Sequence, residues 1–411
     1  MPKVLYIDIW DKGLKNFTRI DPSIKKLGAE TLLVHIGSFK EKTNYKQKNI
    51  DGLTIRDIKF YKTYFLETVI KKEKPDVIII LNLSFLIDRA IINIARKYNI
   101  KVVYLAHGKL LEKGLSEEMK IKKNEKIKKN KSKILRAKNA LYLLNYLSSV
   151  GWSKAPRVLF NILKGIHKDP ADFLYFAKFN KELNADKILV YSEEDKDFLI
   201  FKGFPQNKIK VIGNPEICVF MKSNSEDKKL FIKNLGITPP FLYAVYLDDG
   251  LLQANFISKE DWYRHLIEIN NLLNSRNISL VIKLHPRTDI QKDIDFFNKQ
   301  NIIALKDADF KNLLIHSEFA ISMFSSTIVY ALLLYKKVLI PSWGVMKDLI
   351  IKNYPENLVK YCLSKEDFLK NINYSLRPED KLNIDKYLGN TNINSIELIS
   401  NEINNLLILK R

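Results

Sequence analysis

Short apolar segments alternate with helix-length segments along most of this chain, and this alternation restricts the fold more than any other feature of the sequence. The first series of apolar segments comprises residues 3–9, 31–36, 77–82 and 101–106. Strands separated by helices of this length form right-handed βαβ units, so the sequence predicts an α/β fold with parallel sheets. The pattern returns at residues 187–191, 210–212, 241–247, 280–284, 302–305, 319–322 and 338–341.

The two series of strands indicate two domains, separated by a Gly-Asn-Pro-Glu sequence at residues 213–216 and a charged stretch at residues 223–229, so we expect the domain boundary near residues 216–238. Ligands of parallel sheets collect outside the carboxyl ends of the strands, so we expect the two sheets to face a central cleft that holds the ligand. The expected parts are residues 1–218 with a basic helical insertion at about 112–180, residues 239–385, and a helical tail, residues 386–411, that packs back on the first domain.

Composition restricts the class of protein and the compartment. The hydrophobic content of 46% in 411 residues is that of an ordinary globular protein. Only Cys218 and Cys362 are present and the amino terminus does not resemble a secretory signal, which predicts a reducing cytoplasm. The apolar stretches are far shorter than the roughly 20 residues that cross a bilayer. The net charge of +22 predicts an anionic partner: nucleic acid, a membrane surface or a phosphorylated substrate.

One basic segment does not fit the alternation. Ten lysine and arginine residues lie between Lys120 and Lys138, and aromatic and apolar residues such as Trp152 and Phe160 follow. Such a segment is typical of a surface that binds anionic lipid, where each basic residue contributes about 1 kcal/mol. A solvated loop explains the same composition, so both interpretations stay open.

Two strand ends in the second half carry polar residues suited to a phosphate group. In the first, proline keeps the backbone of the preceding histidine extended, and the imidazole can donate to a phosphate oxygen. In the second, hydroxyl residues begin an apolar helix, where backbone amides and the helix dipole attract an anion by about 0.3–2 kcal/mol. A core histidine and a plain helix cap are the structural alternatives. The candidate residues are Lys283, His285, Pro286, Arg287, Ser325, Ser326 and Thr327.

A histidine followed by glycine ends the apolar strand at residues 102–106. The glycine lets a substrate approach the backbone, and His107 is a candidate general base, a role that typically contributes about 10²- to 10⁴-fold to a rate. The alternative is a structural histidine. His107 and Gly108 are therefore the first candidates for the reacting centre.

Acidic residues follow two further strands. Asp248 and Asp249 precede Gly250, and paired carboxylates can act as a base or hold a metal, although Asp-Asp-Gly is also an ordinary turn. Asp8 and Asp11 lie near Gly13 at the end of the first strand, where a turn is the favoured interpretation.

Several enzyme classes lack their sequence signatures here. The chain has no Cys/His cluster at metal-ligand spacing, no Gly-x-x-x-x-Gly-Lys loop, and no Gly-x-Gly-x-x-Gly after its first strand. Zinc enzymes, P-loop NTPases and standard dinucleotide oxidoreductases are therefore disfavoured.

The order of several short motifs over about residues 100–345 resembles the bacterial surface-polysaccharide transferases of the two-domain GT-B type. The chain is similar to CDP-glycerol glycerophosphotransferases of teichoic acid synthesis, and to capsule transferases that use CMP-linked sialic acid or Kdo. This resemblance implies two Rossmann-like domains, with the nucleotide bound by the second. The motifs are His107-Gly108, residues 185–192, residues 212–215, residues 283–286 and Ser325-Ser326.

The resemblance leaves the general base open. The His-Gly histidine of the polyol-phosphate enzymes corresponds to His107, whereas the acidic pair of the bacterial sialyltransferases corresponds to Asp248 or Asp249. The chain departs from both families, because Asp-Asp-Gly stands where the former carry a Pro-Thr-Trp-type strand end and its acidic pair lies on the donor side. The acceptor side is expected to include Asp8, Asp11, Gly13 and Gly108.

Together these patterns predict a metal-independent, inverting glycosyltransferase that needs no cofactor. It is expected to move a nonulosonic acid or Kdo from a CMP donor to a capsule polysaccharide, lipopolysaccharide or other lipid-linked glycan. The expected location is peripheral, at the cytoplasmic face of the membrane, held through the region from Lys120 to Lys138. The alternatives are a CDP-polyol phosphotransferase, a non-catalytic GT-B-like scaffold and a basic nucleic-acid-binding protein, although no nucleic-acid reader motif is present.

Overall fold

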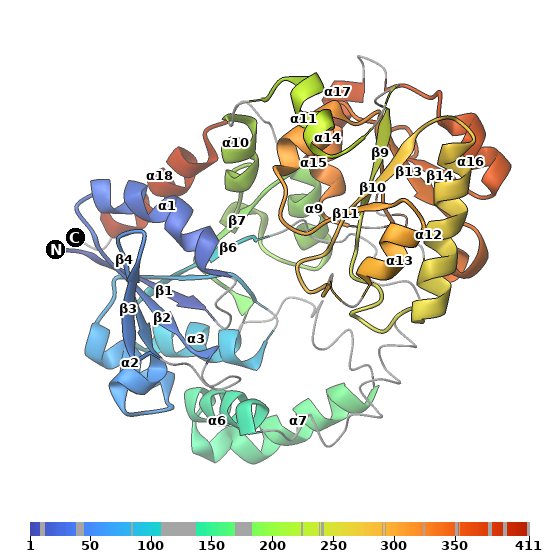
Figure 1. Cartoon of the computed structure of the whole chain (residues 1–411). Coiled ribbons are helices and arrows are strands. Elements are labelled where there is room, and N and C mark those ends of the chain that lie inside the picture. Colours follow the sequence, from blue (N-terminus) through green and yellow to red (C-terminus); the bar gives the residue numbers. More distant parts are fainter. Residues whose placement is uncertain are drawn as a thin grey trace. The chain divides into compact units, whose positions relative to one another are not determined.

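The computed structural model describes most of the chain in two compact units (Figure 1). Within the described residues, the first unit comprises residues 1–110, 123–218 and 388–411, and the second comprises residues 219–387. The residues outside the description are 9–12, 38–44, 84, 108–136, 169–182, 223–224, 238, 240–241, 290, 292, 324, 350–351, 353, 377–379, 389–392 and 409–411, and the side chains of 137–139, 165–168, 222, 381–382 and 386.

The first unit is built on an eight-stranded sheet in the order β3-β4-β2-β1-β5-β6-β7-β8. All of its neighbouring strands are parallel except the hairpin of β3 and β4. The strands are β1 (Lys3–Asp8), β2 (Glu30–His35), β3 (Gln47–Ile50), β4 (Leu53–Asp57), β5 (Val77–Ile80), β6 (Lys101–Leu105), β7 (Lys187–Val190) and β8 (Ile209–Val211).

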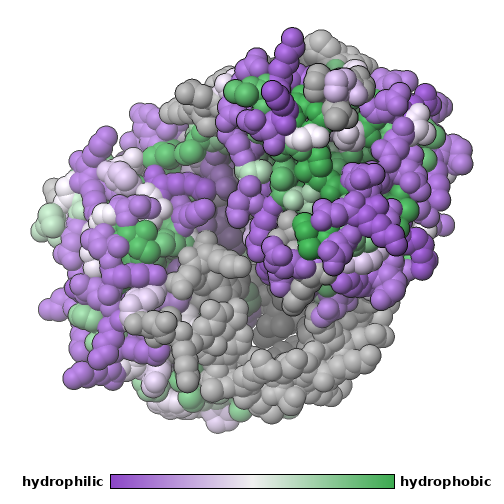
Figure 2. All heavy atoms as spheres, in the orientation of Figure 1, coloured by the Kyte–Doolittle hydropathy of each residue, from purple (hydrophilic) through white to green (hydrophobic). Residues whose placement is uncertain are grey.

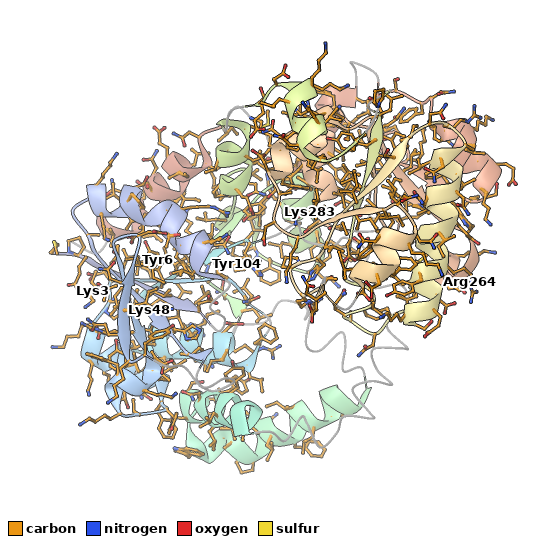
Figure 3. The ribbon with its side chains drawn as sticks, viewed as in Figure 1. Lys3, Tyr6, Lys48, Tyr104, Arg264 and Lys283 are labelled. Atoms are coloured by element: carbon orange, nitrogen blue, oxygen red, sulfur yellow. The ribbon has the colours of Figure 1, made fainter. Side chains whose placement is uncertain are left out.

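Helices cover this sheet on both faces because its right-handed crossovers run outward from the centre in both directions. Helix α1 packs beside α18, and α3 packs beside α2 and α6 (Figure 1). Tyr6 of β1 donates a hydrogen bond to Asp21 of α1 (3.2 Å) and so ties that helix to the central strand (Figure 3). The helices are α1 (Leu14–Lys26), η3 (Ile58–Tyr61), α2 (Leu66–Glu73), α3 (Leu86–Lys97), α6 (Ala137–Val150), η4 (Trp152–Lys154), α7 (Ala155–Lys168), α9 (Glu193–Phe201), η6 (Gln206–Lys208) and α18 (Ser395–Ile408).

The last helix of the chain belongs to the core of the first unit. Ile399, Ile403 and Leu406 of α18 are buried with the apolar residues of the central strands, and α18 lies against α1 and β5. Helix α10 (Pro215–Lys222) begins in the first unit and ends in the second.

The second unit is a six-stranded parallel sheet in the order β11-β10-β9-β12-β13-β14. Its strands are β9 (Tyr243–Leu247), β10 (Ser279–Lys283), β11 (Ile303–Leu305), β12 (Phe319–Ile321), β13 (Val338–Pro341) and β14 (Lys360–Cys362). Its helices are α11 (Lys228–Asn234), α12 (Lys259–Asn274), α13 (Ile294–Lys299), α14 (Phe310–His316), α15 (Ile328–Leu333), η8 (Gly344–Leu349), α16 (Lys365–Asn371) and α17 (Asp380–Leu388).

The predicted α/β class with two parallel-sheet units is confirmed, whereas the cleft between the halves stays a prediction. Strands buried on both faces account for this agreement, since they form continuous apolar runs that are easily read from sequence. The outer surface is mainly hydrophilic in the view of Figure 2, as expected from 68 basic and 46 acidic residues. Among the described helices, none combines the length and apolarity needed to span a membrane.

A buried histidine makes the stability of the second unit depend on pH. His265 of α12 is 3% exposed, and its ring packs against Tyr246 and Trp343 with centroid distances of 5.9 and 6.3 Å. Burial lowers its pKa from 6.5 to about 4, against the opposing charge of Glu268. The unfolded chain therefore binds more protons than the folded chain between these values, and stability falls as the pH drops.

We expect the free energy of unfolding to decrease by about 2 kcal/mol between about pH 7.5 and pH 5, because His265 binds a proton in the unfolded chain and not in the folded chain. Urea titrations of the wild type and His265→Gln at both pH values measure this difference. The variant should lose less stability than the wild type on acidification by that amount. Equal losses in the two proteins would show that His265 is not responsible.

Candidate functional site

A cavity of about 270 Å³ opens at the carboxyl edge of the first sheet. Its lining comes from the ends of β1, β5 and β6, from the first turns of α1, and from the start of α10. This is the edge at which α/β sheets bind ligands. The lining residues are Asp8, Gly13, Lys15, Asn16, Arg19, Leu81, Asn82, His107 and Glu216.

The carboxylate of Asp8 lies against the backbone of Gly13. Asp8 is 3% exposed, and a Cβ atom added at Gly13 would come within 2.2 Å of its Oδ2 atom. Only glycine allows this approach, so Gly13 sets the position of the carboxylate. Both residues were predicted on the acceptor side, and the structure brings them together, whereas Asp11 lies outside the described residues.

A second buried carboxyl lies close enough to sense the charge of Asp8. Burial raises the pKa of Asp88 in α3 to about 7, and Asp8 adds to this increase, while the N–H of Phe85 and the charge of Arg89 oppose it. The carboxyl group of Asp88 is therefore partly protonated near neutral pH. A carboxyl group that senses the charge of Asp8 can therefore change its own charge under ordinary conditions.

His107 follows β6 and reaches the same cavity. The residue is exposed, yet the protein atoms around its ring remove part of its hydration, which lowers its pKa below 6.5, while a hydrogen bond with the backbone of Leu81 acts in the opposite direction. The imidazole is consequently neutral at pH 7 and able to accept a proton. Gly108 lies outside the described residues.

Two basic side chains from α1 lie at the cavity, and sequence reasoning missed both. Lys15 and Arg19 come from the first turns of the helix, and Arg19 forms an ion pair with Glu216 (3.0 Å). The cavity therefore combines positive charge with carboxylates and a neutral imidazole, which suits an anionic substrate that undergoes proton transfer. Asn16 and Asn82 were also missed, because an isolated asparagine carries no recognisable signal.

A buried row of titratable residues continues along the same edge. Asp8, His35 and Asp57 are direct register partners on β1, β2 and β4, and all three are at most 3% exposed. Nδ1 of His35 lies 3.5 Å from Oδ2 of Asp57. A Cβ atom at Gly37 would come within 2.0 Å of the His35 ring, so glycine again permits the packing. His35 and Asp57 were not predicted, although a histidine two residues before a glycine at a strand end was an available signal.

In the second unit, Asp248 connects the ends of β9 and β10. Its carboxylate accepts hydrogen bonds from the N–H of Gly250 (2.9 Å), the N–H of His285 (3.0 Å) and the hydroxyl of Thr288 (3.0 Å). Asp248 is 7% exposed. These bonds hold the loops after β9 and β10 together. The carboxylate predicted as a catalytic base is therefore an acceptor of three hydrogen bonds within the protein.

Asp249 connects β9 with β12 in the same way. Its Oδ2 atom accepts a hydrogen bond from the N–H of Met323 (2.8 Å), and the hydroxyl of Ser322 lies 3.3 Å from its Oδ1 atom. The two aspartates therefore fix the carboxyl ends of three adjacent strands, β10, β9 and β12. The catalytic assignment of the pair stays a prediction, while the contacts themselves give both residues a positioning role.

His285 packs against the glycine that follows the two aspartates. A Cβ atom at Gly250 would come within 3.0 Å of Cγ of His285, and Gly250 has a φ of +70°. The N–H of Arg287 donates to Nδ1 of His285 (3.1 Å), so the neutral ring carries its proton on Nε2 and is a donor there. Pro286 and Arg287 are exposed.

Some of the remaining residues predicted to contact phosphate form hydrogen bonds within the protein, and one is exposed. Lys283 donates to the backbone carbonyl of Lys306 (2.8 Å), and burial lowers its pKa (Figure 3). The hydroxyls of Ser325 and Thr327 lie 2.7 Å apart, whereas Ser326 is exposed. The lysine run from 120 to 136 lies outside the described residues.

The comparisons with known proteins find similarity in structure alone. Neither the family models nor the curated proteins include a match. The chain aligns with the MnaA–UDP complex of S. aureus at a TM-score of 0.55 and 13% identity, over 100% of this chain and 98% of the other.

Two further solved structures carry an enzyme name. The UDP-GlcNAc 2-epimerase from Methanocaldococcus jannaschii aligns at a TM-score of 0.53 and 14% identity over 98% of this chain and 99% of the other. The enzyme of the same name from Neisseria meningitidis, bound to UDP-GlcNAc, aligns at 0.50 and 14% over the whole of both chains.

These similarities correct the functional prediction. The neighbours that carry an enzyme name here are UDP-GlcNAc 2-epimerases and not sialyl or Kdo transferases. The predicted CMP-sugar glycosyltransferase of capsule or lipopolysaccharide synthesis is therefore wrong, as are the CDP-polyol phosphotransferase and nucleic-acid-binding alternatives. His-Gly, His-Pro and Ser-Ser mark strand ends of a fold that hosts several reactions, so they do not determine the reaction. The chain has the two-domain, GT-B-like fold of these proteins.

Proposed function

We propose that this protein is an enzyme that acts on a UDP-linked sugar, and that it inverts C2 of a UDP-N-acetylhexosamine. The observation that carries the proposal is the alignment of nearly the entire chain with several UDP-GlcNAc 2-epimerases. The composition of the cavity in the first unit gives the proposal its chemical content.

The size of the cavity favours the sugar as its occupant. Sites that enclose a whole small molecule measure about 300–1,000 Å³, and this cavity of about 270 Å³ is slightly smaller. It therefore suits one part of a nucleotide-sugar. Lys15 and Arg19 supply positive charge that favours an anionic substrate at this edge.

The proposed reaction requires proton transfer on two faces of one carbon. Inversion at C2 breaks the C–H bond on one face and forms a new C–H bond on the other, so a base and an acid are needed. C2 has no neighbouring carbonyl to accept the electron pair, so the pair forms a C1–C2 double bond as the C1–O bond breaks and UDP leaves. The new C–H bond forms as UDP adds back to C1. His107, neutral at pH 7, is the proposed base on one side, and Asp8 is the proposed partner on the other. No cofactor enters this proposal.

The second unit is proposed to contact the nucleotide through its exposed residues. The hydrogen bonds of Asp248, Asp249 and Lys283 engage those side chains internally. Arg287 and Ser326 are exposed at the same edge of the sheet. These two residues therefore remain the proposed contacts of UDP.

Proton NMR of UDP-GlcNAc incubated with the protein in D₂O tests the proposal. Protonation of the opposite face by a different group brings solvent deuterium to C2, so we expect the C2 proton signal to disappear as UDP-ManNAc forms. In parallel, UDP should raise the melting temperature more than CMP, CDP or GDP, because a ligand that binds the folded state alone stabilises it by RT ln(1 + [L]/Kd). Binding of UDP without deuterium uptake at C2 would refute epimerisation. A larger increase in melting temperature with CMP than with UDP would refute UDP as the bound nucleotide.

A further inference from the structure

Helix α7 carries an apolar face that faces solvent. Phe160 and Leu163 are 66% and 58% exposed, and Trp152, in η4 just before the helix, is 58% exposed. The other side of the helix is fixed to the protein, because Val158 and Ile162 pack in an apolar cluster with Tyr146 of α6. Helices α6 and α7 lie side by side (Figure 1). We call Trp152, Phe160 and Leu163 the apolar face of α7.

This face lies in a long stretch without negative charge. Residues 126–168 contain eleven lysine and arginine residues and no aspartate or glutamate. Lys154, Arg157 and Lys164 are exposed within η4 and α7. The combination of exposed aromatic and apolar side chains with unbalanced positive charge is typical of helices that lie in a membrane interface.

We propose that η4 and α7 dock the protein on an anionic membrane surface, with the apolar face of α7 inserted between lipid headgroups. No described helix is long and apolar enough to span a membrane, so the contact is with the surface. Trp152 suits this position because its ring is apolar and its indole N–H can remain hydrated. This inference does not depend on the proposed enzymatic activity.

A second copy of the chain fits this face less well. In a symmetric dimer the same patch meets itself, so Arg157 and Lys164 of one copy would lie near the same residues of the other. The surrounding segment offers no carboxylate to pair with them, and like charges across an interface oppose association. An anionic lipid surface supplies the missing negative charge.

Sedimentation with lipid vesicles tests the proposal on the full chain. We expect binding to vesicles of phosphatidylcholine with about 30% phosphatidylserine, and at least tenfold weaker binding to phosphatidylcholine alone, since each basic residue near an anionic surface contributes about fivefold. Tryptophan emission should shift to shorter wavelength on binding. In a Trp10→Phe background, which removes the fourth tryptophan, the shift should be absent once Trp152→Phe is added, because Trp262 and Trp343 are buried already.

Two double variants separate the apolar and electrostatic contributions of the helix. Phe160→Ser with Leu163→Ser should weaken binding by at least tenfold, and Arg157→Gln with Lys164→Gln should weaken it by about 25-fold. The control is Phe201→Ser, which removes an aromatic ring that is 82% exposed on α9, and it should bind as the wild type does. All these positions are exposed, so the variants should fold.

Three results would overturn the proposal. The first is equal binding to neutral and anionic vesicles, and the second is binding that the α7 variants leave unchanged, which would place the contact elsewhere in the chain. The third is a dimer in light scattering without lipid that the apolar variant converts to a monomer. That result would assign the face to a second copy.

Discussion

Replacing His107 by glutamine is expected to lower the rate of the proposed UDP-GlcNAc epimerisation by about 10²- to 10⁴-fold, the usual contribution of a general base. Glutamine keeps a polar side chain at the cavity but cannot accept a proton near neutral pH. The melting temperature and the affinity for UDP should stay close to those of the wild type, because the residue is exposed. Rates and KM values from the NMR assay measure the effect.

The role of His107 as a base also predicts the direction in which the rate changes with pH. The pKa of His107 lies below 6.5, so the wild-type rate should fall only when the pH drops below that lowered value and protonates the imidazole. His107→Ala should regain part of its activity on addition of free imidazole, which a structural role would not allow. A variant that turns over at the wild-type rate would remove His107 from the mechanism.

Asp248→Ala is expected to destabilise the second unit by about 3–5 kcal/mol. The change leaves the buried N–H groups of Gly250 and His285 without their acceptor, and each unsatisfied group costs about 1–3 kcal/mol. The melting temperature should fall on the order of 10 °C. Differential scanning calorimetry measures this loss.

Neighbouring variants provide the comparison for Asp248. Asp248→Asn retains one carbonyl oxygen and should lose less stability than the alanine variant. Asp249→Ala should also lose less, because Asp249 is more exposed than Asp248 and its bond from the hydroxyl of Ser322 is long (3.3 Å), although the N–H of Met323 donates at 2.8 Å. If Asp248→Ala keeps the wild-type melting temperature and loses only activity, then Asp248 is catalytic and its positioning role is refuted.

The sequence predicted the fold well where strands are buried on both faces, and poorly at the edges of the sheets. The strands predicted at 77–82 and 101–106 were found as Val77–Ile80 and Lys101–Leu105. The hairpin of β3 and β4 was missed, because its residues are largely polar and partly exposed. Its turn, Asp51-Gly52, with both φ angles positive, was a signal available in the sequence.

The candidate site was only partly predictable for a different physical reason. His107, Asp8 and Gly13 lie at or near strand ends, where polar residues after an apolar run indicate a ligand site. Lys15 and Arg19 reach the cavity from a helix, and Glu216 is about 200 residues away in sequence. Only the folded sheet brings these groups together, and no spacing rule in one sequence reports such a contact.

Because α18 is part of the core of the first unit, it affects when that unit can finish folding during synthesis. Ile399, Ile403 and Leu406 leave the ribosome more than 300 residues after β1 and β5, yet they complete the apolar core around these strands. Domains made early in synthesis generally fold before the rest of the chain appears. Here the first unit must wait, incompletely packed, until residues 395–408 have been made, and a chain released before that point leaves the unit unfinished.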